Sequence, residues 1–286
     1  MLDLILLGII VLWLVSATLF DIKTKEVPNW LTFSLIIISF CIFIIKSISE
    51  KNIIYIINSL LSFGFFIIIG NIMYYTNQWG GGDSKLLMGL GAALPLYPQV
   101  LSFSIKSIYL PLSLLINIIL IGTVFGLLSA TYFGIKNKKK FLKEFKILNK
   151  KKRKINLILF LILILGVLTS IILSDIVLRK LLIFISILPI FFNYLLISTK
   201  AIELSSMYKK IKTKDLVEGD WVTEKVIVNK KIIYSPKKTG ITKEQIKRLQ
   251  KYKKEIIVKQ GIVFVPVILI ATIITLIYGN LILYLI

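Results

Sequence analysis

Long runs of apolar residues alternate with shorter polar segments along most of this chain. Eight such runs cover residues 2–20, 31–45, 53–75, 86–104, 108–134, 155–174, 181–199 and 261–285. Most of them approach or exceed the about 20 residues that a helix needs to cross a bilayer. The run at 31–45 is short, and Pro95 and Pro98 interrupt the run at 86–104. The pattern predicts an all-α polytopic membrane protein with about eight transmembrane helices.

The longest polar stretch, residues 200–260, predicts a small α+β insert between the last two membrane helices. Two runs, at residues 221–228 and 231–234, flank Asn229 and Lys230 and are expected as the two strands of a hairpin. Thr242 followed three residues later by Gln245 is a capping-box pattern, which marks the start of a helix. We therefore expect a β-hairpin and a helix here.

These patterns divide the chain into five parts. The expected parts are a membrane core of about five helices at 1–134, a polybasic loop at 135–154, two further transmembrane helices at 155–199, a small polar domain at 200–260 and a C-terminal transmembrane helix at 261–286.

Composition supports a membrane location and explains the strong positive charge. Hydrophobic residues make up 57% of the chain and the mean hydropathy is +0.87, whereas soluble domains are about 45–50% apolar. There are 36 Lys and Arg residues against 14 Asp and Glu residues, for a net charge of +22. On a soluble protein this charge would suggest nucleic acid, but here the lysines follow the loops, so no nucleic-acid partner is expected.

The distribution of basic residues predicts the orientation in the membrane. Of the Lys and Arg residues, 31 lie in segments 21–30, 76–85, 135–154 and 200–260, and 5 lie in the segments between them. Because basic residues collect in cytoplasmic loops, these four segments are expected in the cytoplasm and both termini outside. The lysine-rich segment 135–154 is also expected to contact anionic lipid.

The side chains that are absent exclude several kinds of chemistry. The chain has no histidine, so histidine bases, Ser-His triads and imidazole metal sites are excluded. Its one cysteine, Cys41, lies inside an apolar run and has neither a disulfide partner nor a Cys-x-x-Cys partner for zinc. We expect no metal and no cofactor.

Two aspartates at the ends of apolar runs are the main candidates for catalysis. Asp21 ends the first run, and Asp83 precedes the fourth, so both are expected on the cytoplasmic face. A carboxylate at the edge of a bilayer is costly and needs a functional or electrostatic reason. Two neighbouring carboxylates share a proton, so one can activate water while the other protonates a carbonyl oxygen. Taken alone, each could instead cap a helix or pair with Lys25 or Lys85.

The residues beside these aspartates could shape a peptide-binding site. Gly80, Gly81 and Gly82 precede Asp83 and permit close approach of another backbone. Pro28 restricts the preceding residue away from helical conformations and so fixes the turn after Asp21.

Together the two segments resemble the signature motifs of a known family. Phe-Asp-Ile-Lys-Thr-Lys-Glu-Val-Pro-Asn-Trp and Gly-Gly-Gly-Asp-Ser-Lys-Leu resemble those of the type IV prepilin peptidases, which include the archaeal preflagellin peptidases and are membrane aspartyl proteases of the Gly-x-Gly-Asp class. The resemblance is good over about residues 10–95. It implies that Asp21 and Asp83 are the catalytic dyad, and that Pro28, Asn29, Gly80, Gly81, Gly82 and Lys85 shape the site.

The resemblance also implies a reaction and a location. The protein would remove the basic leader peptide from prepilin or preflagellin precursors at the cytoplasmic face of the plasma membrane. Bacterial relatives carry an N-terminal Cys-x-x-Cys domain and also N-methylate the mature pilin. This chain starts in an apolar run and has one cysteine, so we predict cleavage without methyl transfer and an archaeal source.

Two other functions remain open from the sequence. The aspartates could be proton or cation sites of an ion-coupled membrane transporter. The chain could also be a catalytically silent scaffold for pilus assembly.

Simple preflagellin peptidases have six spans, and we expect the extra helices and the 200–260 insert to influence substrate choice.

Overall fold

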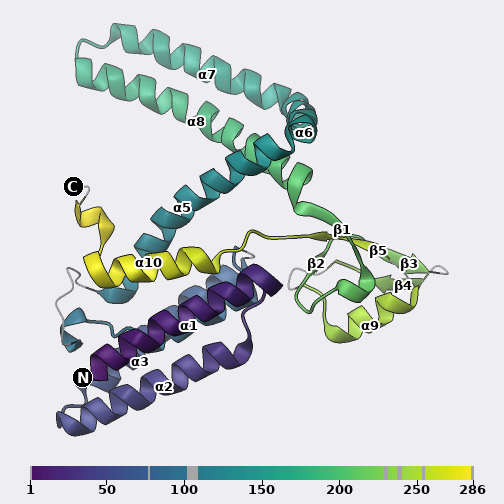
Figure 1. Cartoon of the computed structure of the whole chain (residues 1–286). Coiled ribbons are helices and arrows are strands. Elements are labelled where there is room, and N and C mark those ends of the chain that lie inside the picture. Colours follow the sequence, from purple (N-terminus) through teal and green to yellow (C-terminus); the bar gives the residue numbers. More distant parts are fainter. Residues whose placement is uncertain are drawn as a thin grey trace. The chain divides into compact units, whose positions relative to one another are not determined.

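The computed structural model describes residues 2–76, 78–101, 109–228, 231–236, 240–252 and 255–284. The chain forms two compact units (Figure 1). The first unit combines Met1–Leu127 with Ile262–Ile286, so the two ends of the chain belong to the same unit. The second unit is Leu128–Gly261.

The regular elements of the first unit are all helices in the residues that the structure describes. Its helices are α1 (Leu2–Thr24), α2 (Asn29–Ser49), α3 (Ile54–Tyr75), α4 (Gly81–Ala93), the first part of α5 (Leu110–Lys136) and α10 (Val265–Tyr278), with short 3₁₀ turns η1 (Pro98–Val100) and η4 (Leu281–Tyr284).

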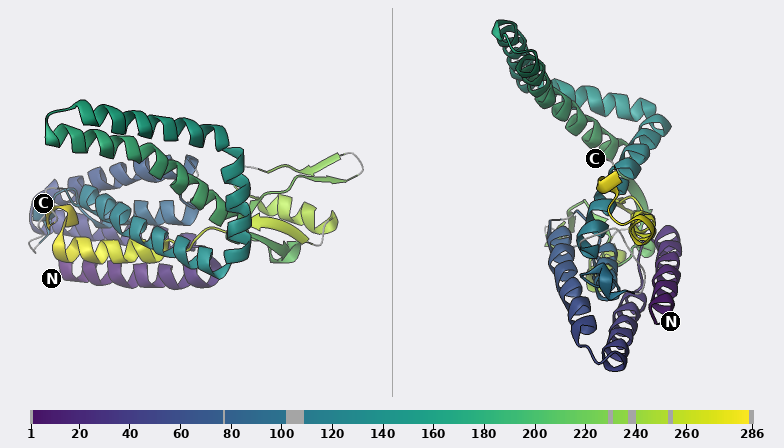
Figure 2. Two further views of the ribbon diagram at one scale, coloured as in Figure 1. Left: turned by 90° about the horizontal axis from the view of Figure 1, so that it is seen from above. Right: turned by 90° about the vertical axis from the view of Figure 1, so that its left-hand side faces the viewer.

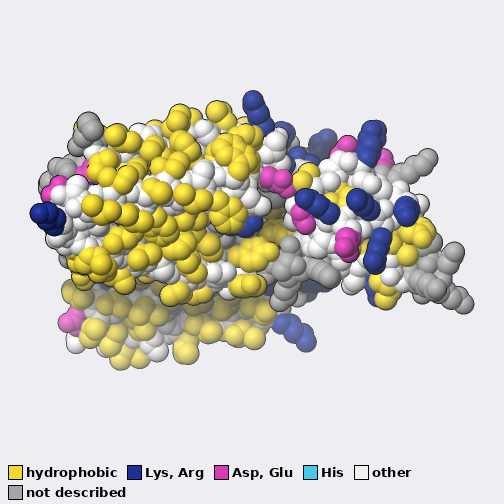
Figure 3. All heavy atoms as spheres, turned by 90° about the horizontal axis from the view of Figure 1, so that it is seen from below, with side chains coloured by type: hydrophobic (Ala, Val, Ile, Leu, Met, Phe, Trp, Pro, Cys, Tyr) yellow, Lys and Arg dark blue, Asp and Glu magenta, His cyan; other side chains and the backbone are white. Residues whose placement is uncertain are grey.

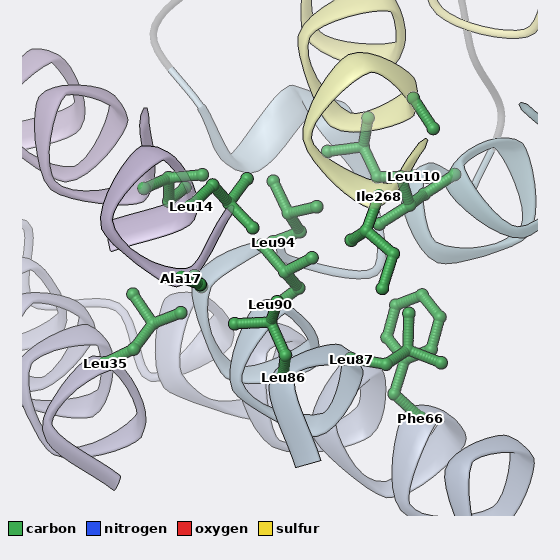
Figure 4. Packing of buried hydrophobic residues seen from close by; sticks show 14 of the residues in the cluster. Leu14, Ala17, Leu35, Phe66, Leu86, Leu87, Leu90, Leu94, Leu110 and Ile268 are labelled. Atoms are coloured by element: carbon green, nitrogen blue, oxygen red, sulfur yellow. The ribbon is translucent and has the colours of Figure 1, made fainter. Parts of the chain in front are cut away.

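Helix α4 is the centre of the first unit's core. Its leucines Leu86, Leu87 and Leu90 are fully buried, as is Leu94 just after the helix. Figure 4 shows these side chains lying between residues of the surrounding helices, which are Leu14 and Ala17 of α1, Leu35 of α2, Phe66 of α3, Leu110 of α5 and Ile268 of α10. Small residues allow this packing, because a Cβ at Gly91 would lie 2.9 Å from the Cβ of Phe66.

The second unit joins a helical hairpin to a small α+β domain. Its helices α6 (Lys138–Lys151), α7 (Arg153–Ile172) and α8 (Ile176–Ile202) are followed by a π-helical turn, η2 (Glu203–Met207). Figure 2 shows α7 and α8 running side by side. Asn193, near the C-terminal end of α8, donates to the Asn156 side chain of α7 at 2.7 Å, which links the two helices by a polar contact.

Two small sheets form the polar domain. In the first sheet, β1 (Tyr208–Lys212) and β2 (Trp221–Val222) both pair antiparallel with the central strand β5 (Glu255–Lys259). A 3₁₀ turn, η3 (Thr213–Asp215), follows β1. In the second, β3 (Val226–Val228) and β4 (Lys231–Tyr234) form a hairpin. Helix α9 (Lys243–Tyr252) buries Ile246 and Leu249 in a core that includes Val258.

Much of the prediction for this domain is confirmed. The hairpin is built from β3 and β4, and the Thr242 N–H donates to Gln245 Oε1 at 3.1 Å, as expected of a capping box. Two features differ. Trp221 and Val222 pair with β5 rather than extending the hairpin. The 135–154 segment, expected as a loop, contains helix α6, because its lysines and leucines are good helix formers.

The predicted number of eight spans is not confirmed. Within the described ranges, six helices are long and apolar enough to cross a membrane: α1, α2, α3, α5, α7 and the continuous helix Ile176–Met207. Helices α4 and α10 have only 13 and 14 residues. The expected span at 86–104 ends early because Pro95 disfavours a helical conformation at Leu94, which is extended. Residues 102–108 lie outside the described residues.

The surface separates into apolar and basic regions. Figure 3 shows one face, on which hydrophobic side chains cover the helical part almost continuously and Lys and Arg gather on the strand-containing part. Exposed apolar residues line α7 and α8 in particular, including Leu165, Ile172 and Phe184. Because an exposed apolar surface of this extent is typical of lipid contact, the chain is a multi-pass membrane protein.

The end of the bundle farthest along α1 from Asp21 contains a buried ion pair. Lys46 Nζ of α2 lies 2.7 Å from both carboxylate oxygens of Asp3 and 4.8 Å from the centre of the Tyr55 ring. The exposed fractions of the two residues are 2% for Asp3 and 7% for Lys46. The pair therefore joins the first two helices at that end.

Removing one partner of this pair should destabilise the fold strongly. Lys46→Met leaves the Asp3 charge buried and should lower the free energy of unfolding by about 3–5 kcal/mol. Thermal unfolding of the purified protein in detergent measures the loss. The double variant Asp3→Asn/Lys46→Met should recover most of it, and a single variant as stable as the wild type would contradict this role.

Candidate active site

Asp21 is a buried carboxylate near the C-terminal end of α1. Only 7% of the residue is exposed. Its Oδ2 accepts a hydrogen bond of 3.1 Å from the backbone N–H of Val265, the first residue of α10. A buried carboxylate needs hydrogen-bond donors to offset its lost hydration. The Val265 N–H is such a donor for Asp21.

A sharp turn after Asp21 brings the chain back toward α4. Lys25 has a left-handed backbone (φ 58°), and its N–H donates to the Asp21 carbonyl oxygen at 2.9 Å, which ends α1. Pro28 has an extended backbone (φ −59°, ψ 136°) and immediately precedes α2. The turn therefore places Val27 against the start of α4, where it is buried.

Asp83 lies in the first turn of α4 and is partly buried. Its Oδ2 accepts a hydrogen bond of 3.2 Å from the N–H of Gly80, the residue that caps the helix. The expected helix-capping role of this aspartate is therefore present in the structure. It does not exclude catalysis, because the other carboxylate oxygen is not used in that bond.

The glycines beside Asp83 serve close packing. Gly81 and Gly82 are the first two residues of α4, so the segment is helical and not unwound. A Cβ at Gly82 would lie 3.2 Å from the backbone nitrogen of Val27, which is tighter than ordinary contact. A Cβ at Gly81 would lie 3.5 Å from the Tyr74 ring, which is ordinary contact. Gly82 is therefore the glycine that the approach of the two motif segments requires.

The structure brings both motif segments into one corner of the first unit. Asp21 and Asp83 lie close enough to interact electrostatically. Lys85 Nζ donates to Asn29 Oδ1 at 2.8 Å, which ties α4 to the start of α2. All of the residues predicted from the two motifs thus belong to α1, α2, α4 or the turns that begin them.

One part of this corner was not expected from the sequence. Val265 and its neighbour Phe264 come from the other end of the chain, and the Phe264 ring packs on Trp79 with centroids 5.6 Å apart. Pro266 in the first turn of α10 is a signal for a helix start. Nothing in the sequence indicates that the start of this helix contacts Asp21.

In the part of the chain that the structure describes, no group of three or more His, Cys, Asp or Glu residues could hold a metal ion. The arrangement instead offers two carboxylates, one oriented by each of two helix N-termini.

Comparison with known proteins matches the segment that contains both motifs. Residues 8–130 match the model of the type IV leader peptidase family. These residues are therefore similar to that family, and they make up less than half of the chain. The matched segment contains Asp21, Asp83 and both motifs, whereas α10 and nearly all of the second unit lie outside it.

Three curated relatives are preflagellin peptidases of methanogenic archaea. That of Methanococcus voltae is 33% identical over 98 residues, which cover 34% of this chain and 42% of the relative. That of Methanocaldococcus jannaschii is 27% identical over 124 residues, 43% and 50% of the two chains. That of Methanococcus maripaludis is 30% identical over 97 residues. The match thus spans half or less of each relative, and no solved structure matches the chain.

A matched pair of alanine variants tests the packing role of Gly82. Both Gly81→Ala and Gly82→Ala gain the same helix propensity, but only the second presses on the Val27 backbone. Gly82→Ala should therefore be less stable than Gly81→Ala by about 1–3 kcal/mol. Thermal unfolding in detergent measures the difference, and equal stabilities would show that the two segments do not pack as described.

Proposed function

We propose that this protein is a membrane aspartyl endopeptidase that removes the basic leader peptide from type IV pilin-like precursors, that is, prepilins or preflagellins. The observation that carries the proposal is the close packing of the two motif segments, since a Cβ at Gly82, next to Asp83, would lie 3.2 Å from the backbone nitrogen of Val27 in the turn after Asp21. The names of the matching relatives support preflagellins as the substrate class.

The chemistry follows from two carboxylates in one desolvated site. Such a pair does not ionise fully near neutral pH, because the second negative charge is repelled by the first. The ionised member takes a proton from a water molecule, which attacks the scissile carbonyl carbon. The protonated member donates to the carbonyl oxygen. This route needs neither metal nor cofactor.

The surrounding residues orient this pair. Lys85 and Asn29 hold the start of α4 against the start of α2, and Pro28 fixes the turn between Asp21 and α2. Gly82 admits the Val27 backbone, and a Cβ at Gly80 would lie 3.2 Å from Asp83 Oδ2, so both glycines keep side chains away from this carboxylate. The precursor is proposed to bind beside Asp83 as an extended segment. Peptide cleavage requires such an extended segment, because the carbonyls of a helix are already hydrogen-bonded and shielded.

The proposed orientation puts the dyad at the cytoplasmic face of the plasma membrane, with both termini outside. Its support is the concentration of Lys and Arg in the segments on one side of the predicted spans. Leader cleavage would then fall between the basic leader and the hydrophobic helix of the precursor.

Helix α6 is the proposed contact with anionic lipid. It has no buried residue and carries Lys138, Lys139, Lys140 and Lys143 together with exposed Leu142 and Ile147. An amphipathic helix with a basic face and an apolar face lies in the membrane interface and is attracted to anionic headgroups.

The family match favours the peptidase over the two alternatives. An ion-coupled transporter would use the aspartates as proton or cation sites, and a silent assembly scaffold would not use them in catalysis. Neither alternative explains why both aspartates lie in motifs of a leader peptidase family.

Conservative substitution of either aspartate should abolish cleavage. Asp21→Asn and Asp83→Asn each remove one member of the acid–base pair and should lower the rate by at least about 10²-fold. The assay is cleavage of an epitope-tagged preflagellin in membranes that contain this protein, with the new N-terminus identified by mass spectrometry.

Asp175→Asn is the matched control for these two variants. Asp175 caps α8 in the second unit through bonds to the N–H groups of Val177 and Leu178, and asparagine caps a helix about as well. This variant should cleave at the wild-type rate. If either dyad variant cleaved as fast as Asp175→Asn, the assignment of the dyad would be wrong.

Neutralising α6 should reduce lipid binding. Replacing Lys138, Lys139, Lys140 and Lys143 by Gln removes attraction worth about 1 kcal/mol per residue at the surface. The anionic phospholipid that co-purifies with the protein, measured by mass spectrometry, should fall several-fold. Replacing Lys247 and Lys251 of α9 by Gln is the control. An unchanged lipid content in the α6 variant would contradict the proposed contact.

A further inference from the structure

Helices α7 and α8 of the second unit form an open cavity that the proposed reaction does not use (Figure 1). Its volume is about 330 Å³, within the range of about 300–1,000 Å³ that is typical of ligand pockets. All of its lining residues come from these two helices. Both helices are long and apolar enough to cross a membrane, so a ligand of this cavity can reach it from lipid.

The cavity changes from polar to apolar along α7. Arg153 lines it at the start of the helix, Asn156 follows one turn later, and Phe160 lines it one turn beyond that. Leu157 and Tyr194 add apolar surface, and the side chains of Leu157, Phe160 and Tyr194 are all exposed. A ligand that fits this lining has a polar head and an apolar body.

Hydrogen bonds between side chains fix the polar end. Asn193 of α8 is buried and donates to Asn156 Oδ1 of α7 at 2.7 Å, and Asn156 donates to Asn149 Oδ1 of α6 at 2.6 Å. Lys152 Nζ also lies 3.4 Å from Asn193 Oδ1. Polar side chains within spanning helices are costly, and they often mark functional sites.

Arg153 gives the polar end a positive charge. Within the described residues, no acidic side chain forms an ion pair with Arg153. The guanidinium group binds phosphate through two parallel hydrogen bonds, and Lys152 and Lys154 beside it add positive charge. Basic pockets between transmembrane helices are typical binding sites for anionic lipid headgroups.

We propose that this cavity binds one anionic phospholipid, whose phosphate contacts Arg153 and whose hydrocarbon chain lies against Leu157 and Phe160. The apolar wall favours a lipid over free phosphate, because free phosphate would leave that wall uncovered. The positive charge disfavours a basic peptide such as the proposed leader. In the proposed orientation, the start of α7 lies at the cytoplasmic leaflet, where anionic lipids are concentrated.

This site differs from the proposed lipid contact of α6. The lysines of α6 attract anionic headgroups at the membrane surface, whereas the cavity holds a single molecule between two helices. The inference does not depend on the peptidase function, since neither Asp21 nor Asp83 belongs to the second unit.

Native mass spectrometry of the protein in detergent, titrated with phosphatidylglycerol, tests the role of Arg153. The wild type should bind one molecule tightly. Arg153→Gln should weaken this binding at least about 10-fold, because hydrogen bonds to charged groups are lost.

Lys154→Gln is the matched control, because it removes the same charge one residue away and Lys154 does not line the cavity. It should bind lipid as the wild type does. Equal losses in the two variants would show that binding follows total charge, and the proposal would be wrong.

The two halves of the ligand are tested separately. Phosphatidylcholine, which has the same chains but no net charge, should bind the wild type at least about 10-fold more weakly than phosphatidylglycerol and should lose this difference in Arg153→Gln. Glycerol phosphate, which has a head without chains, should not displace the bound lipid. Displacement by glycerol phosphate would identify a site for free phosphate and overturn the proposal.

Filling the cavity should also displace the lipid. Ile190→Phe adds bulk to a lining residue, whereas the control Ile185→Phe adds it to an exposed residue of α8 outside the lining. Only the first variant should bind phosphatidylglycerol more weakly, with both unfolding at similar temperatures in detergent. If Ile190→Phe instead dissociated a dimer and kept its lipid, the cavity would be an interface between copies.

The α6 variant separates the two lipid contacts. With Lys138, Lys139, Lys140 and Lys143 replaced by Gln, the tight site should keep its wild-type affinity for phosphatidylglycerol. Loss of the tight site in this variant would assign the bound lipid to α6 and overturn the proposal.

Discussion

A carboxylate buried among apolar helices strongly destabilises a fold unless donors face it, and this site contains the buried Asp21 beside the partly buried Asp83. The first unit meets this requirement with the N-termini of two short helices. Helix α4 presents the Gly80 amide to Asp83, and α10 presents the Val265 amide to Asp21. Both helices are short, with 13 and 14 residues, and the N-terminus of each lies beside one of the two aspartates.

The packing of α4 explains how such a site is stable. Its leucines form the centre of the first unit's core, and Gly91 and Gly82 let neighbouring backbones approach closely at two different points along the helix. The core thus fixes the direction of α4, and that direction fixes Asp83 relative to Asp21. The ion pair of Asp3 with Lys46 joins α1 to α2 far along α1 from Asp21, so α1 is fixed at both ends.

The sequence predicted the membrane class, the pair of aspartates and most of the polar domain, because these depend on local patterns. Apolar runs reveal helices in lipid, and Thr242 with Gln245 reveals a cap. The number of spans could not be predicted in this way. An apolar run such as 86–104 has the same composition whether it crosses lipid or forms the core of a bundle, and Pro95 only suggests where it ends.

The role of α10 was beyond sequence reasoning for a different reason. The bond to Asp21 uses the backbone of Val265, and a backbone amide leaves no residue-type signal. Asn117 is a second example. Its side-chain amide links α5 to α10, but in the sequence it is only one polar residue within an apolar run. Contacts between residues far apart in the chain appear only when the helices are assembled.

The shared-proton dyad is tested most directly by measuring whether Asp21 and Asp83 act as one unit. Cleavage rates of tagged preflagellin are compared for Asp21→Asn, Asp83→Asn and the double variant. Residues that act together show strongly non-additive losses. If the aspartates share one proton and one function, the double variant should be no slower than the slower single variant. Losses that multiply in the double variant would mean that the aspartates act independently, and the shared-proton dyad would be wrong.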